Sequence, residues 1–597
     1  MKLWSISTTV RNPERLRNFL KVLSLLEGKP FNVSNQIIYQ ILLIQKKLYR
    51  PLEIPNKYQS YYENPEIEIP FEVAKDIFNI QGYVDPAMRG RQSVNPLNKL
   101  GFSIAREREG NIIITELGKQ FISDDFDIGY IFFKSLLKLQ FPNPWSKEFS
   151  KKFGFNVQPF IATMHLINNV NKNSEKKGLT KTEFSLFIPS LINFELIKDY
   201  EEKIIRYREQ NNKKSFINEF AKLFYKTNDP NEKQINNFFE YGDNIMRYFR
   251  LTRYFKVSVE NFGADWKIDL EPSRKVEIDH LIKTFSGASI NFNTTGDYLN
   301  YISDISLPRL PFENLHSLKE IAKSLIKQIN EFAKDINIIP ELINSDILIK
   351  DFDKFSMQEL KDYITQLRAF NLDLIDKQKR ISFSVNFDKI QKIIDDLKNY
   401  KLIKKFAPEQ FEKIITDALK IINDELKIKP NYSVDDNGEP IGHATGNKPD
   451  IECFYKNYNS IFEVTLDTSN YQWVRESQPV MRHLRDFESK YSKSTNYCVF
   501  ISPKIHIDTL YHFWTSVKFG YDGFRQKIIP LTTEQFSVFL ELLLNLIQTG
   551  KKFYHTDIEL LYKEIIEMTD KVKGHTEWYS KIPKVIENWK KIILYED

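Results

Sequence analysis

One stretch of the sequence, GNKPDIECFYKNYNSIFEVTLDTSNYQWVRESQPVMR at positions 446–482, organises the interpretation of the whole chain. Two runs rich in β-branched and aromatic residues, 451–455 and 461–466, flank a KNYN turn signal, and this pattern predicts a β-hairpin. Asp450 directly precedes the first run and Glu463 lies in the second, so the hairpin would bring two carboxylates side by side. Mg²⁺ binds such carboxylates when it also grips a phosphate. The stretch therefore predicts a metal site for phosphate chemistry.

Further ionisable side chains follow the hairpin. Glu476 lies in a helix-like segment after the second strand, and His483 stands between Arg482 and Arg485, which together make a basic face suited to a phosphate. Histidine is scarce, with 9 in the chain, and for His443 we favour an ordinary structural role. A Pro-Asp pair followed at a distance by one acid marks a turn more often than a metal site. The neighbouring acid and histidine are what favour the metal interpretation.

Composition sets broad limits on the class of protein. A chain of 597 residues is too long for one hydrophobic core, so several domains are expected. The formal net charge of +6 is mild, so evidence for nucleic-acid binding must come from local clusters. Cys453 and Cys498 have no metal-ligand spacing and are expected to be buried free thiols in a reducing compartment. The apolar run 539–547 is too short to span a membrane, and no signal peptide is expected.

The region 70–123 has the element order of a winged helix. A helix is expected around 73–78, a donor-rich helix over 85–100, and a hairpin from 102–105 and 112–115. In a winged helix the second helix enters the major groove, where Arg suits guanine and Asn or Gln suits adenine. A solvated helix face explains the pattern equally well. The side chains that would reach DNA are Arg89, Arg91, Gln92, Asn95, Asn98 and Lys99.

Two further segments of the N-terminal half, 180–208 and 243–270, are also expected to be helical units. Thr180 and Glu183 form a capping-box pattern that opens a helical unit running to 208. The segment 243–270 predicts a helix and then a hairpin, a possible second wing. Its basic cluster suits contacts to the DNA backbone, although cations at a helix C-terminus are nearly as good an explanation. The members of this cluster are Arg247, Arg250 and Arg253.

The second half of the chain changes from helices to a mixed core. Helical periodicity dominates from 314 to about 402, as in a connector, and an amphipathic helix carrying Glu412 follows. The apolar run 497–503 predicts a buried central strand. The run 527–531 predicts an edge strand, because its proline has no N–H for a ladder. With helices over 534–589, this is the pattern of an α/β nuclease-like core.

Seven motifs carry a resemblance: HATGNKPD (443–450), FEVT (462–465), ESQPVMRH (476–483), STTVRNPERLRNFLKVLSLLEG (7–28), RGRQSVNPLNKLGF (89–102), RYFRLTRYF (247–255) and SLPRLPFEN (306–314). Over nearly its full length the chain resembles the AlwI family of type IIS restriction endonucleases, in the PD-(D/E)xK superfamily. The resemblance implies a prokaryotic, cytoplasmic multidomain α+β protein. Residues 1–305 would be a DNA-recognition region with winged-helix subdomains, 306–402 a helical linker and 403–597 the nuclease domain. It also implies Mg²⁺-dependent hydrolysis at a fixed distance beside a short asymmetric DNA site.

The resemblance also implies roles for individual residues. Asp450 and Glu463 match the metal carboxylates. Glu476 matches a further acidic, metal-binding position, and His483 matches the histidine after it. Glu412 matches another acidic position less securely. Together these five residues make up the expected catalytic set.

One position departs from the superfamily pattern, which has a lysine two residues after the second acid. Thr465 stands at that position here. The general base is therefore left open among a metal-bound hydroxide, His483 and Glu476. Arg482 would stabilise the phosphate.

The expected partner is double-stranded DNA, with a cognate DNA methyltransferase in the same system and no membrane. A single nuclease domain cuts one strand, so double-strand cleavage would require a transient homodimer or a small partner subunit. Two alternatives stay open. One is a strand-specific nicking endonuclease, or the large subunit of a heterodimeric enzyme. The other is a non-catalytic winged-helix regulator that binds DNA without cutting it.

Overall fold

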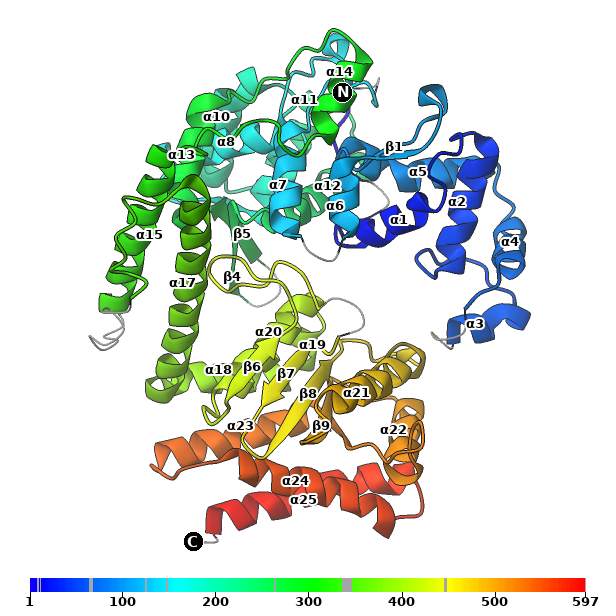
Figure 1. The fold of residues 1–597 in the computed structure, drawn as a ribbon, viewed down its shortest axis with the longest axis vertical. Coiled ribbons are helices and arrows are strands. Elements are labelled where there is room, and N and C mark those ends of the chain that lie inside the picture. Colours follow the sequence, from blue (N-terminus) through cyan, green and yellow to red (C-terminus); the bar gives the residue numbers. More distant parts are fainter. Residues whose placement is uncertain are drawn as a thin grey trace. The chain divides into compact units, whose positions relative to one another are not determined.

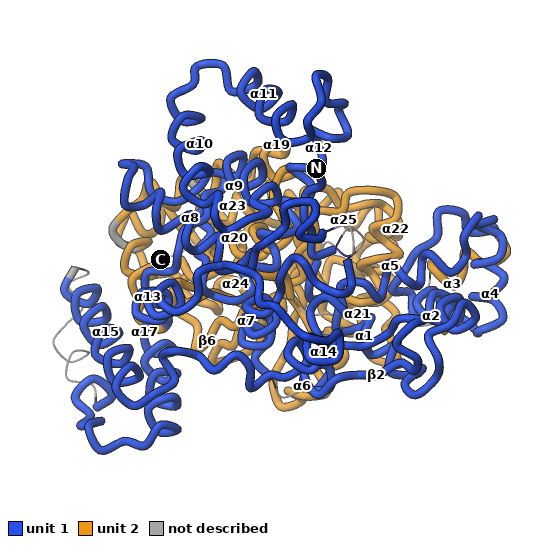
Figure 2. Tube along the Cα trace, turned by 90° about the horizontal axis from the view of Figure 1, so that it is seen from above, with its two compact units in different colours: residues 1–55, 69–261, 265–372 blue, residues 56–68, 262–264, 373–597 orange. Residues whose placement is uncertain are grey.

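The computed structural model describes residues 1–7, 10, 12–63, 68–123, 126–146, 149–261, 265–335, 346–444 and 448–595. They form two compact units, drawn in different colours in Figure 2. Unit 1 comprises residues 1–55, 69–261 and 265–372, and unit 2 comprises 56–68, 262–264 and 373–597. Three predicted stretches lie partly outside the described residues: 445–447 of the HATGNKPD motif, the turn at 262–264, and 336–345 of the helical connector. None of the described helices is long and apolar enough to cross a membrane.

Unit 1 is mainly helical (Figure 1). Its N-terminal elements are α1 (Arg15–Ser24), α2 (Val33–Gln45), α4 (Phe71–Ile80), α5 (Pro86–Lys99), β1 (Ser103–Ile104), β2 (Ile113–Ile114), α6 (Glu116–Ile122), α7 (Ile128–Lys138) and α8 (Pro159–Asn173). The following elements are β3 (Leu179–Thr180), α9 (Lys181–Phe187), α10 (Ile197–Glu209), α11 (Lys213–Tyr225), α12 (Glu232–Leu251), β4 (Phe255–Asn261), β5 (Asp265–Leu270), α13 (Lys275–Thr284), α14 (Thr295–Ser303) and α15 (Leu315–Asp335).

The predicted helix–helix–hairpin order of the first region is confirmed by α4, α5 and the antiparallel pair β1–β2. Helix α5 begins after Asp85, whose carboxylate accepts a hydrogen bond from the amide of Met88 at 3.0 Å, and Pro86 occupies its first turn. The strands pair Ser103 with Ile114, and the short 3₁₀ helix η2 (Glu107–Glu109) lies in the connection between them. The second predicted hairpin is also present, as β4–β5, and β3 extends it into a three-stranded sheet.

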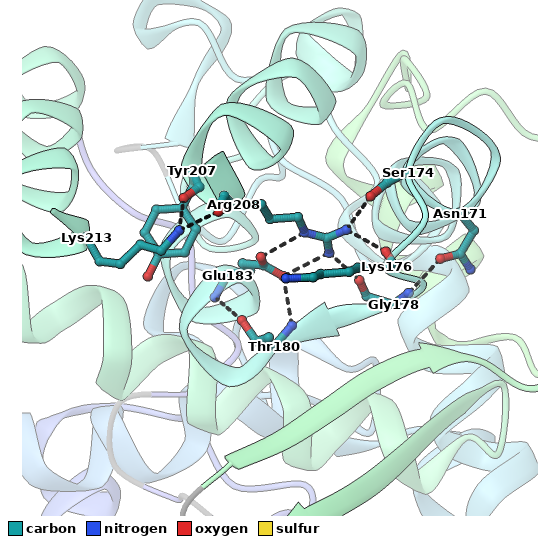
Figure 3. Close-up of polar contacts among 9 residues, drawn as sticks. All are labelled: Asn171, Ser174, Lys176, Gly178, Thr180, Glu183, Tyr207, Arg208 and Lys213. Atoms are coloured by element: carbon teal, nitrogen blue, oxygen red, sulfur yellow. Dashed lines mark hydrogen bonds and ion pairs between the residues drawn. The ribbon is translucent and has the colours of Figure 1, made fainter. Parts of the chain in front are cut away.

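The predicted capping box at Thr180 is confirmed, and it is part of a larger buried network (Figure 3). Glu183 returns its carboxylate to the amide of Thr180 at 2.9 Å. The same carboxylate accepts two bonds from Arg208, at 2.9 and 3.0 Å. Arg208 also donates to the hydroxyl of Ser174 and to the carbonyl of Gly178. The planar guanidinium fork thus fastens α10 to the start of α9.

The predicted connector is mainly helical in its described parts, with turns and coil at 346–356. Beyond α15 it contains α17 (Met357–Val385), α18 (Phe387–Lys398) and α19 (Tyr400–Ile403). The two compact units divide between Leu372 and Asp373, inside the continuous helix α17.

Unit 2 is built on a five-stranded sheet in the order β10-β9-β8-β7-β6. Pairs β6–β7 and β7–β8 are antiparallel, whereas β8–β9 and β9–β10 are parallel. The predicted hairpin, buried central strand and edge strand are confirmed as β7–β8, β9 and β10. The strands are β6 (Lys427–Pro430), β7 (Ile451–Phe454), β8 (Tyr458–Val464), β9 (Thr495–Ser502) and β10 (Ile528–Thr532).

Helices cover this sheet and close a single large apolar core (Figure 1). They are α20 (Pro408–Lys420), α21 (Gln478–Lys490), α22 (Ile507–Phe519), α23 (Thr533–Gln548), α24 (His555–Glu567) and α25 (His575–Tyr595). The strand β9 is buried along almost its whole length, as its continuous apolar sequence predicts. Cys453 and Cys498 are both free and buried, as predicted.

Candidate active site

The end of strand β8 places two of the predicted carboxylates on adjacent strands. β7 and β8 pair Ile451 with Phe462, so Asp450 and Glu463 are the next opposed positions of the hairpin. The Oδ2 atom of Asp450 accepts a hydrogen bond of 2.7 Å from the amide of Val464. This bond ties Asp450, which precedes β7, to the end of β8. The expected neighbourhood of the two carboxylates is therefore present in the structure.

His483 joins this pair from helix α21. Its Nδ1 atom lies 2.8 Å from Oε1 of Glu463, and the histidine is 8% exposed. An ionised carboxylate only accepts hydrogen bonds, so Nδ1 carries the proton whenever Glu463 is charged. The Nε2 atom is then an unprotonated acceptor. It is buried and has no hydrogen-bond partner among the described residues.

Glu476 arrives at the site from a π-helical turn, η7 (Trp473–Ser477), which leads directly into α21. Its Oε1 atom accepts a 2.7 Å hydrogen bond from the hydroxyl of Thr465. Glu412 comes from α20 and is 5% exposed. Its Oε2 atom accepts a bond of 3.1 Å from the amide of Ala444. Elements distant in the sequence thus direct four carboxyl groups to one end of the sheet.

Burial and mutual repulsion set the charge state of these groups. Burial raises the pKa of the Asp450 carboxyl well above its usual range, and the charge of Glu463 adds to the rise. Burial likewise raises the pKa of Glu463, with further contributions from Glu476 and Glu412. Burial raises the pKa of Glu476 to about 6. For His483, burial followed by the charge of Arg482 lowers the pKa to about 4, so the ring is neutral at pH 7.

The donor set fits a hard divalent cation. Carboxylate oxygens are the ligands that Mg²⁺ prefers, and repulsion among buried carboxylates is relieved by a cation between them. Within the described part of the chain, no three His, Cys, Asp or Glu side chains are already gathered closely enough to hold a metal together. The residues that would hold it are Asp450, Glu463 and Glu476.

Arginines flank the carboxylates in different ways. The positive charge of Arg482 offsets part of the rise in the pKa of Glu463 and, after burial, contributes to the lowered pKa of His483. Arg485 instead forms ion pairs with Asp486 and Asp522, at 3.3 and 3.5 Å. Of the two arginines in the predicted basic face, Arg482 is therefore the one whose charge acts on the Glu463 carboxylate.

In unit 1, a groove of about 480 Å³ lies between helix α5 and the connection of the β1–β2 hairpin. From α5 it is lined by Arg91, Gln92 and Asn95, which were among the predicted DNA contacts. The Oδ1 atom of Asn95 is buried and has no hydrogen-bond partner among the described residues. Sequence analysis missed two arginines that the hairpin adds to the groove, Arg106 and Arg108.

The arginines of this region are held by local contacts. Arg91 pairs with Asp85 and donates to Gln36 at 3.0 Å. Arg106 lies over the Trp145 ring, 4.5 Å from its centre. Arg108 donates to the carbonyl of Pro144 at 2.6 Å. The same kind of contact holds Arg89, whose guanidinium lies 5.3 Å from the ring centre of Tyr83.

Two of the predicted DNA contacts lie inside the fold instead. Asn98 is 2% exposed, and its amide exchanges bonds of 3.0 and 3.1 Å with the backbone of Ala105. Lys99 is 4% exposed and donates to the carbonyl of Ser5 at 3.0 Å. Asn98 also lines the groove, and contact of either residue with DNA stays a prediction. Asn98 clamps the hairpin to α5, and Lys99 anchors the end of that helix.

The second basic cluster lies at the end of α12. Arg247 pairs with Asp243 one turn earlier, at 3.0 Å. Arg253 follows the helix with a positive φ of 63° and pairs with Asp127 at 3.3 Å. Arg250 lies in the last turn of α12, where a cation complements the helix dipole. Local ion pairing thus accounts for part of this cluster.

Comparisons with known proteins give one family and several weak structural similarities. A family model described as AlwI restriction endonuclease matches residues 98–539. The small subunit of the heterodimeric restriction endonuclease R.BspD6I is 24% identical over 33% of this chain and 98% of its own, with a TM-score of 0.28. The restriction endonuclease FokI is 10% identical over 94% of this chain and 99% of its own, with a TM-score of 0.22. The DNA-bound BpuJ1 endonuclease binding domain is 11% identical over 48% and 90%, with a TM-score of 0.31. No match was found among curated protein sequences.

Proposed function

The chain belongs to the AlwI restriction endonuclease family, and we propose that it cuts DNA with Mg²⁺ at a fixed distance from a short asymmetric site, as a type IIS enzyme. Family membership makes the protein a site-specific DNA nuclease. The observation that carries the finer proposal is the meeting of Asp450, Glu463, Glu476 and Glu412 at one end of the unit 2 sheet, beside His483. Repulsion among these buried carboxylates favours a divalent cation between them.

We assign the chemistry as follows. A bound Mg²⁺ would neutralise charge on the scissile phosphate and make the attacking water more acidic. Asp450 and Glu463 hold the cation, and Glu476 completes the carboxylate set. Arg482 faces the phosphate, where its guanidinium offsets negative charge that develops during attack.

We assign the proton acceptor to His483, which resolves the choice that the sequence leaves open. Its Nδ1 atom lies 2.8 Å from Oε1 of Glu463. A cation that keeps Glu463 ionised would leave the proton on Nδ1 and so fix the tautomer and orientation of the ring. The Nε2 atom, which has no hydrogen-bond partner among the described residues, carries the lone pair that would accept the proton of the attacking water. The neutral state of the ring at pH 7 is the state that a base requires.

We further propose that residues 1–305 recognise the DNA through winged-helix-type subdomains, that 306–402 is a linker and that 403–597 is the nuclease domain. The groove beside α5 would face the bases. Asn95 offers an unpaired acceptor there, and an Asn side chain suits adenine. On this surface, Arg89, Arg91 and Gln92 would contact the DNA. Arg247, Arg250 and Arg253 would contact the DNA backbone.

The described part of the chain holds one carboxylate site of the kind proposed for cleavage, so cutting both strands would need a second copy or a smaller subunit. A cognate methyltransferase would protect host DNA.

The test is a digest of plasmid and genomic DNA with the purified full chain in Mg²⁺, followed by sequencing of both strands at every new end. The proposal predicts ends at one fixed offset from a single asymmetric sequence, and no ends when EDTA replaces Mg²⁺. Ends on one strand alone would identify the nicking alternative. Sequence-specific binding without any new ends in Mg²⁺ would overturn the proposed cleavage.

A further inference from the structure

The hydroxyl of Thr465 is fixed from both sides. Its Oγ1 atom accepts a hydrogen bond of 3.1 Å from the amide of Asp467, and its O–H donates to Oε1 of Glu476 at 2.7 Å. The backbone is equally constrained, because the amide of Thr465 donates to the carbonyl of Ile501 at 3.0 Å and so extends the β8–β9 ladder. The residue is 9% exposed. A hydroxyl held in this way donates its single proton in one direction.

That direction is the carboxylate face of the sheet. In an extended strand, residues two apart point to the same side, so Thr465 points to the side of Glu463. A hydrogen bond to Thr465 therefore brings Glu476 to that side as well. The electrostatics agree with this placement, because the charge of Glu476 raises the pKa of both Glu463 and Asp450.

Hydrogen bonds also fix the position of the turn that carries Glu476. Trp473–Ser477 is π-helical, and such wide turns are rare and are found frequently at functional sites. The turn is anchored by Gln472, which is fully buried. The amide nitrogen of Gln472 donates to the hydroxyl of Ser502 at 3.0 Å, and its oxygen accepts from the amide of His506 at 2.7 Å. One end of the turn is thus tied to the end of β9 and the start of α22, while Thr465 holds its carboxylate.

We propose that Thr465 is a positioning residue for DNA cleavage, and that its hydroxyl holds the Glu476 carboxylate beside Glu463 so that both face the cation. The inference rests on the proposed metal-dependent function. Thr465 acts through Glu476 and contacts neither the cation nor the phosphate.

The test compares Thr465→Val, which removes the hydroxyl at nearly constant shape, with Thr465→Ser, which keeps it. Thr569→Val is the matched control, since Thr569 is buried in unit 2 and its hydroxyl bonds only to the nearby carbonyl of Ile566 among the contacts described. Three quantities are measured on the full chain: the single-turnover cleavage rate, the DNA Kd without metal, and the Mn²⁺ affinity by electron paramagnetic resonance with DNA bound.

We expect Thr465→Val to lower the cleavage rate and the Mn²⁺ affinity by roughly 10- to 100-fold, as for loss of an outer partner of a metal ligand. The DNA Kd should stay unchanged, Thr465→Ser should recover to within a few-fold of the wild type, and Thr569→Val should match the wild type. A wild-type Mn²⁺ affinity in Thr465→Val, or an equal defect in Thr465→Ser, would overturn the inference while the wild type still cuts. A wild type that neither cuts nor binds Mn²⁺ would instead overturn the proposed function and this inference with it.

A mutant cycle separates positioning from general packing. If Thr465 acts through Glu476, adding Thr465→Val to Glu476→Ala should cause no further loss of Mn²⁺ affinity, because the side chain that accepts the hydrogen bond is already gone. Fully additive losses would contradict the inference, even if Thr465→Val alone is poorly folded.

Discussion

The two ring nitrogens of His483 have different surroundings. Nδ1 faces Glu463 at 2.8 Å, whereas Nε2 is buried without a partner among the described residues. A residue that only orients Glu463 needs the first nitrogen, and a proton acceptor needs the second. A substitution that preserves one and removes the other therefore separates the two roles.

We predict that His483→Asn, whose amide can still donate near the position of Nδ1, loses cleavage by about 10²- to 10⁴-fold, the usual contribution of a general base. Its DNA Kd and its Mn²⁺ affinity should stay close to those of the wild type. His483→Ala serves as the comparison, because it loses both nitrogens and should also weaken Mn²⁺ binding. Cleavage by His483→Asn at the wild-type rate would show that Nε2 is not the acceptor.

The sequence allows the neighbourhood of Asp450 and Glu463 to be predicted, because hairpin register follows from the turn and from strand alternation. It indicates Glu476 as a further acid after the second strand, but it does not fix its position, because Glu476 lies on the η7 turn. Glu412 lies on α20 and was named as a site residue only by the resemblance to a family. The bond from Thr465 to Glu476 was not predictable at all. It depends on a π-helical turn, which no simple residue pattern marks.

At the level of elements, α5 and the β1–β2 hairpin form one structural unit around a groove. Asn98 fixes the distance between them through its two bonds to Ala105. Sequence periodicity predicted the helix and the hairpin, but it could not tell that Asn98 and Lys99 are buried and bonded to the backbone, whereas Asn95 offers the groove an acceptor without a partner among the described residues. Side-chain direction on a short helix depends on which neighbouring elements cover it. Strand β6 was not predicted from the sequence, because it is only four residues long and ends in Pro430.

The groove gives a test of base recognition. We predict that Asn95→Ala relaxes selectivity at one base pair of the recognised site, by about 1–3 kcal/mol, as expected for loss of a bidentate base contact. Selection of cleaved or bound sequences from a randomised library measures this effect. Asn79→Ala on the exposed end of α4 is the control. A uniform loss of affinity across all sequences would assign Asn95 to the phosphates, and unchanged selectivity would remove the groove from the recognition surface.

Helix α7 carries two buried lysines that fasten the segment 304–308. Lys138 donates to the carbonyl of Asp304, and Lys134 donates to that of Pro308 at 2.7 Å. Burial, reinforced by the charge of Lys134, lowers the pKa of Lys138 to about 7. In the unfolded chain this pKa is near 10.5. Between these two values the unfolded state holds a proton that the folded state has released, so the free energy of unfolding rises with pH.

We therefore predict that the stability of the wild type rises relative to Lys138→Met between pH 7 and pH 9, by at most about 1.4 kcal/mol per pH unit. Thermal unfolding of both proteins across this range gives the comparison through Tm. Lys172→Met, at an exposed position of α8, should show no such trend. A difference in Tm that stays constant from pH 7 to pH 9 would contradict the lowered pKa.

At the scale of the whole molecule, the chain forms two compact units that share one continuous helix, α17, and we propose that recognition and cleavage are divided between them. The helical character of 314–402 is readable from its periodicity. The division between Leu372 and Asp373 is not, because the pattern is the same on both sides of it. The described residues supply one set of the proposed catalytic carboxylates, so, if the protein cuts both DNA strands, second-strand cleavage is the step that should depend on protein concentration.

The central claim is that the Asp450–Glu463 site cuts DNA that another part of the chain has recognised. It is tested most directly by measuring binding and Mg²⁺-dependent cleavage of the recognised site in the same samples of wild type, Asp450→Asn, Glu463→Gln and the exposed control Glu534→Gln. The account predicts wild-type Kd values for all four proteins, with cleavage reduced by at least about 10²- to 10³-fold in the first two variants alone. Cleavage at the wild-type rate by either Asp450→Asn or Glu463→Gln would contradict it.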